Sequence, residues 1–266
     1  MMDINQYKEI VTEANIAFSE VFDRFLSTWG MISQFRTFTT MGIKNTENNY
    51  KVYISKIVDE MRPDGFLYGA LKDTTSFFES GDNRKFIDNA LKQAIRKTSS
   101  IIDATALVFG HSILDALLND YLDIIFIKDP SSYDYLLMNQ KVKIEELIDF
   151  GKDEILNIKR KRKISNLKRE SIVIKSDILH NICSPSHNYN AGGYKFDKNY
   201  IENIDNARHN IVHGLTINFK SEEIEEYLDY LFKSAGYYLY MMFKKFDLKI
   251  IADPLIREQL KKGLRN

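Results

Sequence analysis

The chain contains little of what disulfide-rich, linker-rich or turn-rich proteins need. Cys183 is the single cysteine among 266 residues, so an internal disulfide is excluded and a reducing compartment is expected. Four prolines and twelve glycines are too few for a collagen-like chain or for an all-β protein with many tight turns. A chain of this length can bury a core without covalent staples, as one large domain or as a domain with an extension.

Long uninterrupted apolar runs are also missing. The most apolar stretches, 101–109 and 227–243, are interrupted by Asp103 in the first and by Asp229 and Lys233 in the second. Both are shorter than the roughly 20 apolar residues that a membrane span requires. The N-terminus has no apolar segment of signal-peptide type. We therefore expect no contact with a membrane and a cytoplasmic location.

The chain has no net charge, but its charges are unevenly distributed along the sequence. Thirty-seven basic and 37 acidic residues give a formal net charge of zero, which disfavours a strongly basic nucleic-acid-binding protein. Seven cations nevertheless occur in eleven residues: Lys159, Arg160, Lys161, Arg162, Lys163, Lys168 and Arg169. This basic run is either a solvated helix face or a surface that binds RNA phosphates.

Helical spacing of apolar residues dominates the chain, which predicts an all-α fold. The predicted helices cover 3–38, 50–61, 65–79, 84–127, one or two helices within 131–182, 197–213, 221–246, and a short segment from Pro254. Residues 39–49, with Gly42 and three asparagines, are expected to form a loop, and Gly110 to kink or break the long helix. Ser221, Asp129 and Asp253 are the expected helix caps. We divide the chain into a helical N-terminal extension, 1–82, and a helical bundle, 83–266.

The most informative segment is 200–215, where a cation lies within an apolar stripe. On a helix, Ile204 and Ile211 share this stripe with Arg208, and a buried arginine needs an anionic partner. His213 follows five residues later, which corresponds to a rotation of about 140° on an ideal helix. Arg208 and His213 therefore converge only if the helix unwinds near its end or if two chains meet.

Two interpretations of this segment remain open. In the structural one, Arg208 forms an ion pair or extends its head to solvent, and His213 stabilises the helix C-terminus. In the functional one, Gly214 lets the helix unwind, so that a guanidinium that can bind phosphate and an imidazole that can transfer a proton come together.

Residues 208–213, Arg-His-Asn-Ile-Val-His, resemble the R-x4-6-H signature of the HEPN superfamily. Residues 115–119, Asp-Ala-Leu-Leu-Asn, resemble the acidic phrase E-A-F-L-N on an earlier helix of that family, with aspartate in place of glutamate. The resemblance covers about 84–246. It implies a HEPN-like helical bundle that dimerises and so brings two motifs into one cleft. It also implies a metal-independent endoribonuclease, in which the 2′-hydroxyl of RNA attacks the adjacent phosphate and leaves a 2′,3′-cyclic phosphate and a 5′-hydroxyl.

The resemblance also implies roles for individual residues. Arg208 would hold the scissile phosphate, and His213 would act as general acid or base. His209 or Asn210 would orient the phosphate or the ribose, and Asp115 would pair with Arg208. The expected partners are an RNA substrate, a second copy of the chain, and an antitoxin or defence-system protein, in a prokaryotic toxin or antiviral defence role. The alternative is a catalytically silent HEPN-like module that binds a nucleotide or a partner protein.

Two further sets of residues bear on the site. His111, Asp115 and Asn119 are spaced by four, so they form a polar stripe that faces either Arg208 or solvent. His180, Cys183 and His187 supply only three donors and do not have zinc-finger spacing. We therefore predict no metal site and no cofactor.

Overall fold

The computed structural model describes residues 12–60, 81–138, 151–183, 194–214 and 220–264, and every regular element within these ranges is a helix. The predicted all-α fold class is confirmed. The elements are α1 (Glu13–Glu60), α3 (Gly81–Lys128), the 3-10 helix η2 (Pro130–Leu137), α5 (Lys152–Leu167), α6 (Ile172–Cys183), α7 (Lys198–Val212), α8 (Ser221–Lys245) and α9 (Pro254–Leu264).

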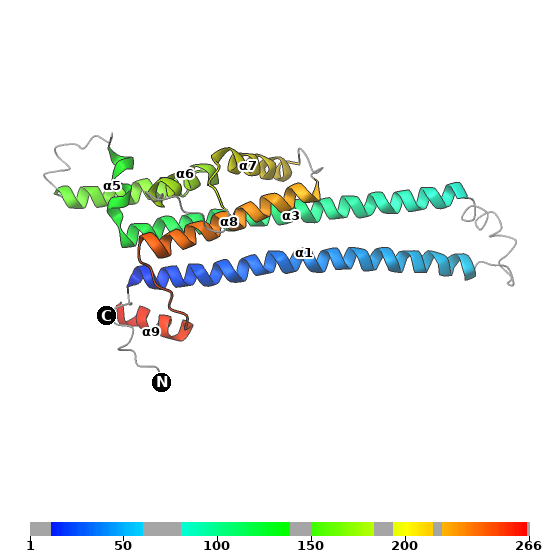
Figure 1. Ribbon diagram of the computed structural model, residues 1–266, viewed down its shortest axis with the longest axis horizontal. Coiled ribbons are helices and arrows are strands. Elements are labelled where there is room, and N and C mark those ends of the chain that lie inside the picture. Colours follow the sequence, from blue (N-terminus) through cyan, green and yellow to red (C-terminus); the bar gives the residue numbers. More distant parts are fainter. Residues whose placement is uncertain (1–11, 61–80, 139–150, 184–193, 215–219, 265–266) are drawn as a thin grey trace.

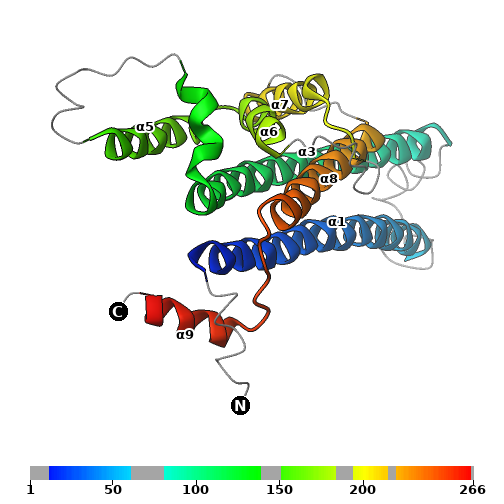
Figure 2. The same cartoon turned by 60° about the vertical axis from the view of Figure 1, so that its left-hand side comes forward.

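Two very long helices, α1 and α3, run antiparallel and organise the molecule (Figure 1). Each has 48 residues, which is a length of about 72 Å at 1.5 Å per residue. At one end, α8 packs on both of them, and α6 and α7 pack on α3 (Figure 2). α9 packs on α1, and η2 joins α5 to the end of α3. The motif helix α7 is therefore held against the central helix of the fold.

A single core joins the N-terminal part of the chain to the bundle. Phe18 of α1, Leu118 of α3 and Tyr238 of α8 are fully buried members of the same apolar cluster. The Tyr238 hydroxyl donates a hydrogen bond to the carbonyl oxygen of Ser176 (2.9 Å), which satisfies its buried polar group. The predicted division between 1–82 and 83–266 falls at the start of α3, and α1 nevertheless contributes to the bundle core.

The predicted loop at 39–49 is wrong, because α1 continues through it without a break. Gly42 is exposed, and a Cβ atom added there would meet no atom within 4 Å, so the cost of this glycine is its helix propensity, about 1 kcal/mol relative to alanine. Packing along α3 outweighs this local preference. The predicted helix over 50–61 is the last part of the same element, and the one predicted over 65–79 lies outside the described residues.

Gly110 does not break α3, which is helical from Gly81 to Lys128. A Cβ atom at position 110 would lie 2.7 Å from Cδ2 of Leu228 on α8. Real Cβ atoms do not approach other atoms so closely. Gly110 therefore lies where α3 and α8 pack closely. The absence of a side chain lets the two helices approach each other at this point.

Two of the predicted caps are confirmed and one is shifted. The carboxylates of Asp129 and Asp253 accept backbone N–H groups at the starts of η2 and α9. α8 begins at Ser221 itself, with Lys220 as the capping residue. The Ser221 hydroxyl donates instead to Asp103 Oδ2 (2.7 Å), because α3 passes close to the start of α8.

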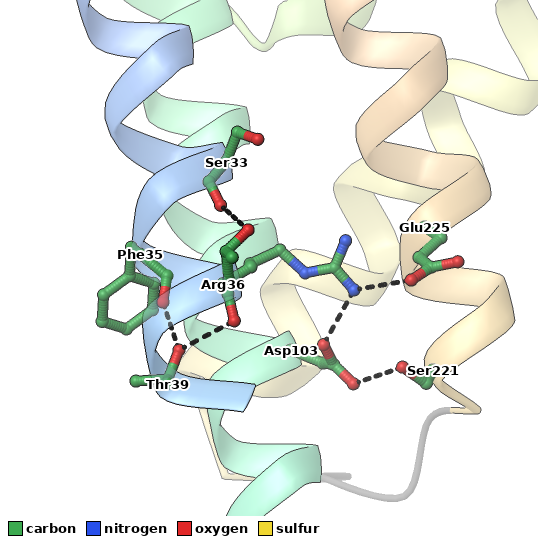
Figure 3. A network of polar contacts seen from close by, with 8 residues as sticks. Ser33, Phe35, Arg36, Thr39, Asp103, Ser221 and Glu225 are labelled. Carbon is green, nitrogen blue, oxygen red and sulfur yellow. Dashed lines mark hydrogen bonds and ion pairs between the residues drawn. The ribbon is translucent and has the colours of Figure 1, made fainter. Parts of the chain in front are cut away.

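A polar network at this point joins all three long helices (Figure 3). Arg36 Nη2 on α1 donates to Asp103 Oδ1 on α3 (3.1 Å) and to Glu225 Oε1 on α8 (3.2 Å). Asp103 is buried, and Ser221 satisfies its other oxygen. Beyond this network α1 and α3 extend together past the start of α8 as a two-helix arm (Figure 1).

One described segment, Ile95–Lys128 of α3, is long and apolar enough to cross a membrane by length and composition alone. Its apolar residues include Leu114, Leu118 and Leu122, which are fully buried in the core. The central helix of a folded domain has the same composition, so the absence of a membrane span stays a prediction.

Candidate functional site

The motif helix α7 has clear local start and stop signals. The Asp197 carboxylate accepts a hydrogen bond from the backbone N–H of Asn199 (3.0 Å). The helix ends at Val212, and Gly214 has φ +66°, in the left-handed region that glycine adopts without strain. The prediction of a helix over 197–213 that ends at Gly214 is confirmed.

A pocket of about 420 Å³ lies where α7, α3 and the connection between α5 and α6 meet. Its walls include His111 and Asp115 of α3, Arg169 and Ser171 beside the start of α6, and Arg208 and His209 of α7. The polar stripe of α3 therefore faces the motif helix, and the solvent-facing interpretation is wrong for His111, which is buried. Asn119, one turn further along, has its Oδ1 buried and without a hydrogen-bond partner in the described part of the chain.

Arg208 is a partly buried cation that forms no salt bridge with a described carboxylate, although its charge acts on the nearby Asp205. Its Nε is buried and makes no hydrogen bond among the described residues. A buried N–H donor that is left unsatisfied costs about 1–3 kcal/mol. The structural interpretation of Arg208 as one half of an ion pair therefore finds no partner in this part of the chain.

Asp115 pairs with a lysine and not with Arg208. Its Oδ1 lies 2.6 Å from Nζ of Lys175 on α6, and the Lys175 side chain is only 1 % exposed. The expected Asp115–Arg208 pair is absent from the described contacts, because the buried ammonium of Lys175 takes the carboxylate. Asp115 thus compensates a buried charge beside the pocket.

His111 is held by a carboxylate from the motif helix. Its Nε2 lies 2.7 Å from Oδ1 of Asp205, which connects α3 to α7. This hydrogen bond, aided by the positive charges of Arg208 and His209, holds the pKa of Asp205 below its usual value despite partial burial. Asp205 is therefore ionised at neutral pH and fixes the orientation of the imidazole.

The two histidines of the motif lie next to each other in different surroundings. The ring centroids of His209 and His213 are 4.3 Å apart. His209 lines the pocket with Arg208, whereas His213 caps the end of α7 and is exposed outside the described pocket wall. Asn210 is half-buried and also lies outside that wall. Of the four motif residues predicted to form the site, Arg208 and His209 are the two that line this pocket.

The predicted RNA-binding run on α5 is partly engaged in ion pairs. Arg160 donates two hydrogen bonds to the Asp134 carboxylate (2.7 and 2.8 Å), and the same contact raises the pKa of its guanidinium. Lys168 pairs with Asp123 (2.5 Å). Lys161 and Arg162 are exposed, while Lys159 and Lys163 are half-buried. Asp134 competes with any phosphate for Arg160, so this residue is a poor candidate for RNA binding.

The discounted metal donors have structural surroundings where they are described. His180 stacks on Phe196 with ring centroids 4.2 Å apart, and burial lowers its pKa. Cys183 is fully buried, and burial raises the pKa of its thiol to about 12. His187 lies outside the described residues. Among those described, no group of three His, Cys, Asp or Glu side chains is arranged to hold a metal.

Sequence reasoning missed Asp205, Lys175, Arg169 and Ser171 as parts of this site. Asp205 precedes Arg208 by three residues, so helical spacing alone places both on one face. Lys175 was detectable as a lysine directly after the apolar residues 172–174. The sequence did not show that Arg169, at the end of the basic run, or the following Ser171 lies in the pocket. Only the packing of α6 against α3 brings them there.

The arrangement offers an anion-binding guanidinium beside two imidazoles, one of them oriented by a carboxylate. Comparisons of the chain with protein-family models, with curated proteins and with solved structures found no match.

Proposed function

We propose that this chain is a metal-independent endoribonuclease of HEPN type. The observation that carries the proposal is Arg208, a partly buried guanidinium without an ion-pair partner in the described chain, in a pocket that also contains His209 and His111. Buried arginines are normally paired, so an unpaired one beside two imidazoles favours an anionic substrate. The R-x4-H resemblance supplies the class of reaction.

In the proposed reaction, Arg208 binds the non-bridging oxygens of a phosphodiester. A base removes the proton of the 2′-hydroxyl, whose oxygen attacks phosphorus while the bond to the 5′-oxygen breaks. An acid protonates that leaving oxygen, which yields the 2′,3′-cyclic phosphate and the 5′-hydroxyl. Positive charge fixed at the phosphate stabilises the transition state, and a single donor of this kind contributes about 100- to 1,000-fold in rate.

In-line attack places the base and the acid on opposite sides of phosphorus. His209 and His213 lie in contact with each other, so within one chain they serve the same side. His111, on the α3 wall and oriented by Asp205, is the imidazole available from another side of the pocket. In a homodimer, His213 of a second copy would be an alternative source of this group.

The experiment incubates the purified full chain with RNA in excess EDTA and maps the ends of the products. We expect cyclic phosphate and 5′-hydroxyl ends, and a loss of rate of at least about 100-fold in Arg208→Ala. His209→Ala and His213→Ala separate the histidine that lines the pocket from the one that lies outside the described pocket wall. Arg96→Ala is the matched control, because Arg96 is an exposed arginine on the arm. Cleavage that requires an added divalent metal, or that is undiminished in a folded Arg208→Ala protein, contradicts the proposal.

One observation favours the alternative of a catalytically silent module that binds a nucleotide or a partner protein. His213, the predicted acid or base, is exposed outside the described pocket wall. The module predicts tight partner binding and no cleavage by the wild type. Expression in a bacterial host separates the two, because growth arrest by the wild type and not by Arg208→Ala supports the nuclease in its proposed toxin or antiviral defence role.

A further inference from the structure

We infer that two copies of this chain form an antiparallel two-fold dimer through one face of the α1–α3 pair. This surface, the α1–α3 face, consists of Met31, Phe35 and Phe38 on α1 and of Ile101 and Phe109 on α3, all of them exposed. The resemblance to HEPN proteins implies a dimer that meets at the motif helix α7, so a different surface is named here. The inference does not rest on the proposed nuclease activity.

The five apolar side chains gather on one side of the helix pair. The Arg24–Asp120 ion pair (2.6 Å) joins α1 to α3 on this side. The three α1 residues of the face follow Arg24 at successive spacings of seven, four and three residues, so they lie on its side of α1. Phe109 precedes Asp120 by eleven residues, or about three turns, so it lies on the Asp120 side of α3. Ile101 is about two turns further along the same exposed surface.

The two helices also bring these residues level with one another. The polar network that joins α1 to α3 (Figure 3) sets the register of the antiparallel helices and places Phe38 level with Ile101. Met31 and Phe109 lie two turns further along and are likewise level. Their exposed fractions run from 39 % for Phe35 to 69 % for Phe38. An exposed apolar patch that crosses two helices marks an interaction surface.

The surroundings of this patch contain no free charge. Within 25–43 of α1 and 98–114 of α3, the only Lys, Arg, Asp or Glu residues are Arg36 and Asp103. These two contact each other on the side that meets α8, where Glu225 also accepts from Arg36. About a quarter to a third of a soluble surface is normally charged, whereas the cores of interfaces are depleted in charge. The α1–α3 face therefore has the composition of an interface core.

A second copy of the chain is the partner that matches this surface. A charged partner would lose its hydration here without gaining an ion pair, so the partner must also be uncharged and apolar at the contact. In a two-fold dimer the same patch serves both copies, which meets this condition. An antiparallel axis that crosses the helices places α1 against α1 of the second copy. It also separates the exposed cations of the two arms, which are Lys44, Lys92, Arg96 and Lys97.

The face is large enough for a specific interface. The shorter uncharged stretch, 98–114, is about 25 Å long at 1.5 Å per residue, and two packed helices are roughly 20 Å wide. As a flat projection, each copy contributes roughly 500 Å² and a dimer buries about 1,000 Å², the size expected of a specific interface.

The first test measures the mass of the full chain in solution by sedimentation equilibrium. We expect Phe38→Glu to halve the mass of the wild-type particle and to weaken association at least about 100-fold, because the symmetry removes two anchors with one substitution. Leu26→Glu is the matched control. Leu26 is 54 % exposed on the same helix and lies about 140° around it from Met31, so this variant should associate as the wild type does. Both variants should retain the wild-type helical circular dichroism.

The second test is cysteine cross-linking. Cys183 is buried, so an engineered cysteine supplies the reactive thiol. Position 35 is at the centre of the α1 part of the face, where the antiparallel axis brings both copies of it together. Phe35→Cys should therefore form a disulfide-linked dimer under mild oxidation. Ser33→Cys should not, because Ser33 is exposed about 200° away around α1.

A monomeric wild type, a Phe38→Glu particle of wild-type mass, or equal cross-linking of the two cysteine variants overturns the inference. A monomeric wild type that binds anionic phospholipid vesicles through Phe38 overturns it in favour of a membrane. A dimer that depends on Phe38 in a protein that cuts no RNA supports the dimer while the nuclease proposal fails. RNA cleavage by a monomeric wild type has the reverse meaning.

Discussion

Arg36 and Arg208 are both arginines between packed helices, and they differ in what surrounds the guanidinium. Arg36 reaches two carboxylates, Asp103 and Glu225, and the second oxygen of Asp103 is satisfied by Ser221 (Figure 3). Arg208 reaches no carboxylate among the described residues and keeps a buried N–H unsatisfied. The first arrangement stabilises the fold, and the second leaves binding capacity for an external anion.

The difference follows from how neighbouring carboxylates are engaged. Three acids, Asp115, Glu170 and Asp205, line the pocket together with Arg208, and two of them are held by other residues. Lys175 holds one of them and His111 holds the other. Asp103 and Glu225, by contrast, both accept hydrogen bonds from Arg36 itself. Lys175 and His111 therefore engage Asp115 and Asp205, whereas Glu170 forms no ion pair among the described residues.

The largest expected effect tests whether Asp115 is structural. Asp115→Ala would leave Lys175 buried without its counter-charge, which costs about 3–5 kcal/mol for a fully buried pair. Because the Asp115 side chain is 38 % exposed, we expect about 2–4 kcal/mol of lost unfolding free energy in urea titrations. The double variant Asp115→Ala/Lys175→Met should recover most of it. A stable Asp115→Ala protein that is inactive would instead place Asp115 in the chemistry.

The next effect distinguishes the two arginines by their geometry. Arg208→Lys keeps the charge and loses the planar fork that matches phosphate, so we expect cleavage to fall about 10- to 100-fold with an unchanged melting temperature. Arg36→Lys is the matched control and should cleave as the wild type does. Equal rates for both variants would remove the distinction between a structural and a binding arginine.

Removing the structural arginine should affect stability and not activity. Arg36→Met loses hydrogen bonds to two carboxylates, and we expect a loss of about 1–2 kcal/mol of unfolding free energy with unchanged RNA cleavage. Glu225→Gln should cost less than about 0.5 kcal/mol, because Glu225 is 63 % exposed. If Arg36→Met abolished cleavage in a folded protein, the network would belong to the site.

The smallest effect is an acid dependence from Asp205. Its pKa is lowered, chiefly by the hydrogen bond from His111. A carboxyl whose pKa is lower in the folded state stabilises the fold above its unfolded pKa, and that contribution is lost as pH falls through the lowered value. We therefore expect wild type to exceed Asp205→Asn in stability by less than about 1 kcal/mol at pH 7. The gap should close below pH 3.8, the usual pKa. A gap that does not depend on pH would contradict this linkage.

The local features of the motif helix were predictable from the sequence because they depend on neighbouring residues. The 197–213 helix, its glycine stop and the polar stripe of α3 follow from periodicity and capping. The loop predicted at 39–49 and a break at Gly110 were wrong for a common reason. Glycine and asparagine weaken a helix by amounts that contact with another helix readily exceeds.

The chain's few cysteines, prolines and glycines, together with its apolar spacing, therefore determined an all-helical protein and the positions of most helix ends. Tertiary packing decided which charges are paired. Lys175, Arg169 and the start of α6 are far from Arg208 in sequence and contribute to its surroundings only because α6 and α7 both pack on α3. Pairing depends on distances between helices, and no one-dimensional pattern of residues contains those distances.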